Sequence, residues 1–191
     1  MPRAGLSTAR VVEEAEAVAD EVGLTRLTLA EVAGRLGVRV PSLYKHVDGM
    51  DALVRLVSVR AKSELGDVLA RAAVGLSTRE ALAALCLAYR NWARAHPGRY
   101  ATTVTAPAAG DADDLAASTA VVGVVFAVLA GYGLGEGARV DATRTLRSAL
   151  HGFLVLEAGG GFGLPVDVDR SFERLVDGLV VALHALATTT T

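Results

Sequence analysis

The chain has 191 residues, of which 52% are hydrophobic, with a mean hydropathy of +0.40 and a formal net charge of −2. This length allows one large domain or two small ones, with ample apolar material for a core. The single cysteine, Cys86, excludes an internal disulfide, and the N-terminal stretch lacks the continuous apolar run of a signal peptide. We therefore expect a protein of the reducing cytoplasm.

Helical periodicity begins near the N-terminus. A hydroxyl residue at position 7 or 8 caps a first predicted helix, which ends at Gly23. Thr28 caps a second helix, and Glu31 three residues later completes a capping box. The apolar stripe of this second helix consists of Leu29, Val32, Ala33 and Leu36. Gly37 follows at once and suits a positive φ at the helix end.

The stretch GVRVPSLYKHVDG comes next. Proline inside a helix costs about 3 kcal/mol, but it is tolerated in the first turn, where its missing N–H has no partner to lose. Pro41 therefore indicates the start of a short helix over residues 40–46 rather than a loop. Leu43 and Val47 are the positions of this helix that we expect to face inward.

The remainder of the chain is also helical in pattern. Asp48 is expected to cap a long helix over residues 50–73. Further predicted segments cover residues 77–95, 99–105, 111–132, 140–157 and 172–183. Strict strand alternation is absent, so we predict an all-α fold of about nine helices.

Two short helices joined by a tight glycine turn, the second opened by proline and rich in donors, make a helix-turn-helix. The second helix of such a pair fills the major groove of DNA, with its N-terminal side chains at base edges. Residues 24–62 also carry seven Lys/Arg against three acids, an excess that suits an anionic partner. Chance surface charge explains the same excess, so charge alone does not decide.

The segment LTLAEVAGRLGVRVPSLYKHVDGMDAL resembles the TetR family of bacterial transcriptional regulators. It follows the family signature of Thr-x3-Val-Ala, then Gly-Val, then Leu-Tyr-x-His-Val, and the resemblance covers about residues 24–56. It implies an all-helical homodimer that binds double-stranded DNA and a small molecule. The family's DNA contacts fall on Thr28, Arg39, Val40, Pro41, Ser42, Tyr44, Lys45 and His46.

The resemblance also implies the domain organisation. Residues 1–50 form a helix-turn-helix DNA-binding domain, with its motif at about 28–47, and residues 51–187 form a helical body for ligand binding and dimerisation. Residues 188–191, four threonines, are expected to be a disordered tail. The chain departs from the family near Asp48, where a basic phosphate contact is usual. We therefore expect modest DNA affinity with steep salt dependence.

The stretch from Leu146 to Leu179 resembles a C-terminal domain of part of the family, with a His-Gly element at His151-Gly152. The residues expected at the ligand pocket are Tyr89, Trp92, Tyr100, Phe126 and His151. The aromatic residues fit a simple core equally well, and His151 also fits a polar cluster between helices. The residues expected at the dimer seam are Leu150, Phe153, Phe172, Leu175, Val176 and Leu179.

The leading hypothesis is a repressor that binds a near-palindromic operator as a homodimer and is released by a small, largely apolar effector. Alternatives are an enzyme on a helical scaffold, for which Glu157 and His151 offer the one suggestion, and a DNA-binding protein without a ligand. We expect no cofactor and no metal site. Residues 115–135 carry no charge and are long enough to span a bilayer, but they are expected to form a buried central helix, with no membrane partner.

Overall fold

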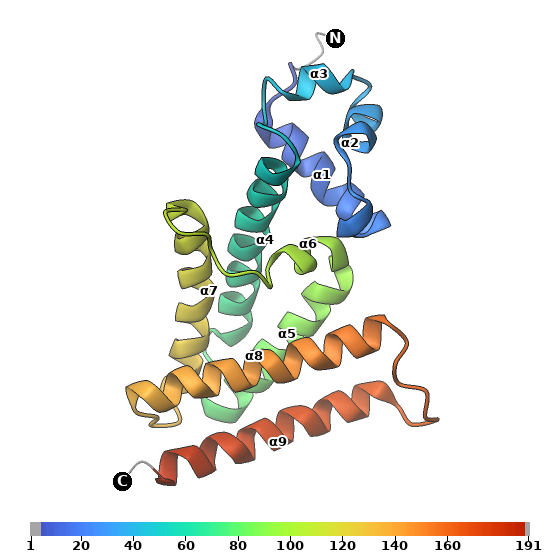
Figure 1. Cartoon of the computed structure of the whole chain (residues 1–191). Helices are drawn as coiled ribbons and strands as arrows, with labels where there is room; N and C mark the ends of the chain where they lie inside the picture. The colour runs from blue at the N-terminus through green and yellow to red at the C-terminus, as the bar shows by residue number, and fades with distance from the viewer. Residues whose placement is uncertain (1–4, 190–191) are drawn as a thin grey trace. The chain divides into compact units, whose positions relative to one another are not determined.

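The computed structural model describes residues 5–189, which form nine α-helices and one short 3-10 helix and contain no strand (Figure 1). This confirms the predicted all-α class. The helices are α1 (Thr8–Val22), α2 (Leu29–Leu36), α3 (Val40–Leu43), α4 (Met50–Ala73), α5 (Thr78–Ala95), α6 (Pro97–Thr102), α7 (Ala112–Ala130), α8 (Glu136–Ala158) and α9 (Val168–Thr189), with the 3-10 helix η1 (Leu24–Arg26) between α1 and α2.

Local sequence determines the helix boundaries. The Ser7 hydroxyl accepts a hydrogen bond from the Arg10 amide at the start of α1. The Thr28 hydroxyl does the same for Glu31 at the start of α2, as the capping pattern predicts. At the C-terminus, α9 continues through Thr189, so it includes the first two of the four threonines expected to form a tail. The last two lie outside the described residues.

The chain forms two compact units. The first contains residues up to Glu64 together with Ala95–Ser118, and the second contains Leu65–Arg94 together with the residues from Thr119 onward. The helices α4 and α7 each contribute residues to both units. The expected DNA-binding segment, residues 1–50, belongs to the first unit, and the boundary at residue 50 stays a prediction.

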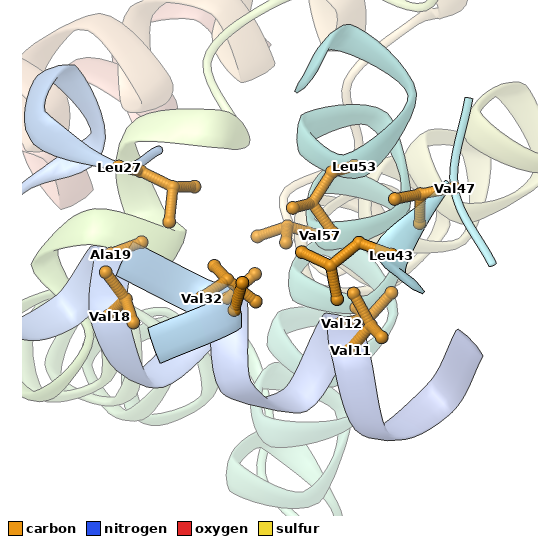
Figure 2. Close-up of a cluster of buried hydrophobic side chains, with 12 residues drawn as sticks. Val11, Val12, Val18, Ala19, Leu27, Val32, Leu43, Val47, Leu53 and Val57 are labelled. Carbon is orange, nitrogen blue, oxygen red and sulfur yellow. The ribbon is translucent and has the colours of Figure 1, made fainter. Parts of the chain in front are cut away.

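Aliphatic side chains from α1, α2, α3 and α4 form the core of the first unit (Figure 2). Val11 and Val18 of α1, Val32 of α2 and Leu43 of α3 are fully buried there. Val57 of α4 joins them, so the long helix contributes to the same core as α1, α2 and α3. This shared core fixes the orientation of α3 within the unit.

Charged side chains hold the other helices of the first unit to this core. Asp20 of α1 accepts hydrogen bonds from the backbone N–H of Arg99 at 2.8 Å and from its Nε at 2.7 Å, which ties α6 to α1. Lys62 of α4 is buried and pairs with Asp114 of α7 at 2.6 Å. The first turn of α7 is therefore anchored on α4.

In the second unit, α8 and α9 run antiparallel and pack side by side (Figure 1). Arg90 of α5 is buried against both. Its guanidinium stacks on the rings of Phe153 and Phe172, at 5.7 and 4.7 Å from their centroids. It also pairs with Glu157 near the end of α8 and with Asp169 at the start of α9, the latter at 2.7 Å.

The helix α7 differs from its prediction. It is long and apolar enough to cross a membrane by length and composition, but only 22% of its most apolar window is buried within the chain. The expectation of a buried central helix is therefore wrong for the isolated chain. The reason is that only a narrow face of α7, which includes Val125, Val128 and Leu129, is buried against other parts of the chain.

Candidate functional site

The turn between α2 and α3 is built by one glycine. Gly37 adopts φ 68° and ψ 30°, the left-handed conformation that glycine reaches without strain. The Val38 amide then donates to the carbonyl of Ala33 at 3.0 Å, which closes the end of α2. The next helix begins two residues later, with Pro41 in its first turn. This geometry confirms that the proline opens a helix.

The short helix α3 presents one face to the core and another to solvent. Leu43 is fully buried and Val47 is 4% exposed, as predicted. The helix ends at Leu43, and residues 44–46 continue as a turn rather than as helix. Tyr44 is 56% exposed, and Lys45 next to it is also exposed. The turn therefore presents a phenol and an ammonium group beside the end of α3.

The other residues expected to contact DNA lie on or beside the same element. Arg39 and Pro41 are exposed, and Val40, Ser42 and His46 are half-buried. Thr28 is exposed at the start of α2, where its hydroxyl oxygen already accepts from Glu31. Its hydroxyl proton is available to an external acceptor, because a hydroxyl both donates and accepts.

The basic excess over residues 24–62 does not form a broad basic surface. Four of its seven cations, Arg35, Arg55, Arg60 and Lys62, are in ion pairs within the chain. Among the described residues, Arg26, Arg39 and Lys45 are the members of this set without an ion pair. Two of these three flank α3, so positive charge is concentrated there.

The start of α4 also differs from expectation. Asp48 was predicted to cap this helix, but the residue before Met50 is Gly49, with φ 103°. The Gly49 carbonyl accepts from the Leu53 amide at 3.2 Å, so Gly49 holds the capping position. Asp48 is exposed beside it. The acid therefore adds negative charge next to α3.

A pocket of about 400 Å³ lies in the second unit, between the end of α4, the start of α5 and the later turns of α7. Ala70 and Ala73 of α4, Ala81 of α5 and Val128 of α7 contribute apolar walls. Ser77 and Thr78 contribute the hydroxyl groups of the lining. The remaining lining residues are also apolar, so the pocket wall carries no charged side chain.

The five residues expected at a ligand pocket do not line this one. Tyr89, Trp92 and Tyr100 are buried as core residues. Phe126 lies under the guanidinium of Arg139, 5.2 Å from the ring centroid, and His151 is half-buried on α8. Sequence reasoning favoured large aromatic residues and missed a pocket lined by alanine, valine and glycine. A run of small residues on α7 was the available signal.

The residues expected at a dimer seam face mainly inward. Leu150, Phe172, Val176 and Leu179 are between 1% and 7% exposed, and Phe153 and Leu175 are half-buried. This burial argues against a seam made from the first four side chains. Glu157, the carboxylate suggested for catalysis, is bound by Arg90 and lies 3.7 Å from Arg94.

Three further features of the described residues concern metal binding and ionisation. No group of three His, Cys, Asp or Glu side chains there is placed to hold a metal ion. Burial raises the pKa of the Cys86 thiol to about 12, so it stays protonated at neutral pH. The hydrogen bond from Arg55 lowers the pKa of the Asp111 carboxyl below its usual value.

Known proteins resemble this chain over nearly its whole length. The tetracyclin repressor-like C-terminal domain profile matches residues 82–179. The HTH-type transcriptional regulator Rv0681 of Mycobacterium tuberculosis is 35% identical over 186 residues, covering 97% of this chain and 85% of the relative. YobS of Bacillus subtilis, also an HTH-type transcriptional regulator, is 33% identical over 185 residues, which cover 94% of this chain and 96% of YobS. Apo ActR of Streptomyces coelicolor has the same fold, with a TM-score of 0.76 at 19% identity, covering 98% of this chain and 99% of ActR.

Fold, exposed turn and relatives together define a transcriptional regulator of the helix-turn-helix type. The match of residues 82–179 to the tetracyclin repressor-like C-terminal domain narrows this class to one family. The chain belongs to the TetR family, as the resemblance in residues 24–56 implied. Members of this family are regulators of transcription rather than enzymes.

Proposed function

We propose that this protein is a repressor that binds a near-palindromic operator as a homodimer, acts in the cytoplasm, and is released by a small, largely apolar effector. The observation that carries this proposal is the surface around α3. Arg39 and Lys45 make no ion pair with any described residue, and Tyr44 between them along the chain is exposed. Groups left unpaired in this way suit the phosphates and base edges of DNA.

Each expected contact has a role in this proposal. Arg39 and Lys45 neutralise phosphates or reach guanine, and the Tyr44 hydroxyl and the Thr28 hydroxyl donate to phosphate oxygens. Val40, Pro41, Ser42 and His46 complete the surface. Two copies of α3 read half-sites about one helical turn apart, roughly 34–36 Å.

A gel shift on palindromes from the protein's own upstream DNA tests the reading surface. The double variant Tyr44→Ala, Lys45→Ala should weaken binding at least tenfold. Arg71→Ala removes one exposed charge at the end of α4, away from the helix-turn-helix in sequence, and should leave binding within twofold. Undiminished binding by the double variant would exclude α3 as the reading helix.

The homodimer requires a surface that the single chain leaves uncovered. The exposed side of α8 carries Val155 with the small residues Ser148 and Gly152, and that of α9 carries Val181 with Gly178. Small residues let helices of two copies approach closely. We therefore place the proposed seam on these outer faces of α8 and α9.

The effector is proposed to occupy the pocket between α4, α5 and α7. Support comes from the apolar lining and from α4, which contributes Val57 to the core that it shares with α3 and contributes Ala70 and Ala73 to the pocket wall. A structural relative supplies a parallel, since ActR has also been crystallised in complex with (S)-DNPA. An effector changes DNA binding only if it favours one of two states of the protein.

A further inference from the structure

The chemistry of the pocket wall restricts what can bind there. Its lining consists of alanine, valine, leucine and glycine residues with two hydroxyl residues. Two basic residues neighbour lining positions in sequence, but neither lines the pocket: Arg79 pairs with Asp177 at 2.7 Å, and Arg71 is exposed on α4. A ligand with a formal charge would lose part of its hydration against this wall without gaining a counter-charge from the lining, which disfavours its binding. An uncharged ligand avoids that penalty.

The two hydroxyl residues lie together at the start of α5. Among the described residues, neither Ser77 nor Thr78 has a side-chain hydrogen-bond partner. Thr78 also has φ 46°, a left-handed conformation that is rare for a β-branched residue. This strained turn places two hydroxyl groups in the lining of an otherwise apolar pocket. Such groups can donate to a carbonyl or accept from an alcohol.

The volume limits the size of the ligand. Pockets for drug-sized molecules usually measure roughly 300–1,000 Å³, and about 400 Å³ lies near the lower end of that range. A compact apolar body with one polar end therefore matches the pocket better than a large or polyhydroxylated molecule.

We propose that the effector is an uncharged amphiphile whose single alcohol or carbonyl group binds Ser77 and Thr78 and whose apolar body lies against α4 and α7. This rests on the proposed function, because it assigns the ligand class to the effector pocket. It predicts discrimination by charge among ligands of equal apolar size.

Displacement of a neutral fluorescent probe, N-phenyl-1-naphthylamine, measures this discrimination on the full chain. We expect 1-decanol to displace the probe at a concentration at least tenfold lower than decanoate or decylammonium. Equal displacement by the three compounds would overturn the ligand class. The double variant Ser77→Ala, Thr78→Val should lower the affinity for 1-decanol severalfold and leave the affinity for the probe unchanged. No change for 1-decanol would overturn the assigned polar end.

Two variants on α7 locate the site. Ala127 lines the pocket, and Ala127→Phe should reduce probe affinity at least tenfold. Ala116 is exposed on the same helix and does not line the pocket, so Ala116→Phe serves as the matched control and should bind normally. Thermal melting of both variants shows whether each is folded. A folded Ala127→Phe protein with full probe affinity would exclude this pocket.

Operator binding of the same proteins separates the two proposals. If 1-decanol binds as described but leaves operator affinity unchanged, the ligand class stands and the effector response fails. If an effector releases the wild-type protein and the Ala127→Phe variant from operator DNA equally well, the proposed effector response stands. The assignment of the effector to this pocket is then wrong.

Discussion

Gly98 and Ala19 bring the backbones of α6 and α1 into direct contact. A Cβ atom on Gly98 would stand 1.9 Å from the carbonyl oxygen of Ala19, well inside any real contact. Asp20, the next residue of α1, accepts from Arg99, the next residue of α6, so the contact is reinforced on its polar side. Only glycine allows the two helices this separation.

The substitution Gly98→Ala should therefore force α6 away from α1. We expect a loss of about 3 kcal/mol in the free energy of unfolding, the upper end of the range typical of steric overpacking. Urea denaturation measures it. Gly123→Ala on α7 is the control, because a Cβ there meets nothing within 4 Å. It should stabilise by about 0.5–1 kcal/mol, and equal effects of the two variants would contradict the close contact.

Arg90→Met tests the buried ion group of the second unit. Removing the guanidinium leaves Glu157 without its closest cation in a partly buried site, which costs about 3–5 kcal/mol. Adding Glu157→Leu should recover much of this loss, because the uncompensated charge disappears. Arg174→Ala breaks an exposed pair with Asp177 and should change stability by less than about 1 kcal/mol. An Arg90→Met protein as stable as wild type would show that the ion group of Arg90, Glu157 and Asp169 contributes little to the stability of the fold.

Glu16 predicts a pH-dependent stability. Burial raises the pKa of its carboxyl above the usual value, against the lowering effect of Arg60. In the window just above the usual pKa, the folded chain binds more protons than the unfolded chain, so this group makes stability fall as pH rises. Glu16→Gln should therefore stabilise at pH 7 relative to wild type and have little effect near pH 4.

Denaturation at the two pH values measures the Glu16 effect. Glu13→Gln provides a control of opposite sign, because the hydrogen bond from Arg10 lowers the pKa of that carboxyl. Its small effect should be destabilising at pH 7. A Glu16→Gln variant that is less stable than wild type at pH 7 would show that the ion pair with Arg60 outweighs burial.

Val181→Asp tests the proposed seam between copies. Val181 is 70% exposed on α9, so a carboxylate there is tolerated by the monomer and destabilising only against a partner. We expect the mass measured by light scattering to fall from dimer to monomer at micromolar concentration. Leu115→Asp, at an exposed position of α7, should leave the mass unchanged. If the Val181→Asp variant remains a dimer, the dimer interface does not lie on this face of α9.

Local signals made most of the fold predictable. The bounds of α4, Met50–Ala73, match the prediction at both ends, because apolar spacing and flanking glycines act within a few residues. The turn at Gly37 and the start of α3 near Pro41 were predictable for the same reason, because each depends on the residue at that position. The cap of α4 was misassigned to Asp48, because the preference of aspartate for capping positions was given more weight than the freedom of the adjacent glycine to adopt a positive φ.

Long-range features were not predictable in the same way. Arg90 meets Glu157 and Asp169 from 67 and 79 positions away, and no local pattern marks such partners. The pocket depends on where small side chains from three helices leave space, which becomes visible only when the helices are packed. The residues expected to contact DNA could be listed from sequence because most of them fall in one short segment, 39–46, and their role stays a prediction.

The pairing of Arg90 also has a consequence for the nine-residue loop at 159–167. Because one guanidinium holds Glu157 before the loop and Asp169 after it, the ends of α8 and α9 are fastened independently of the peptide that connects them. All residues of this loop are exposed. We therefore expect the chain to tolerate being opened there, either to insert a reporter domain or to divide the protein into two fragments that reassemble.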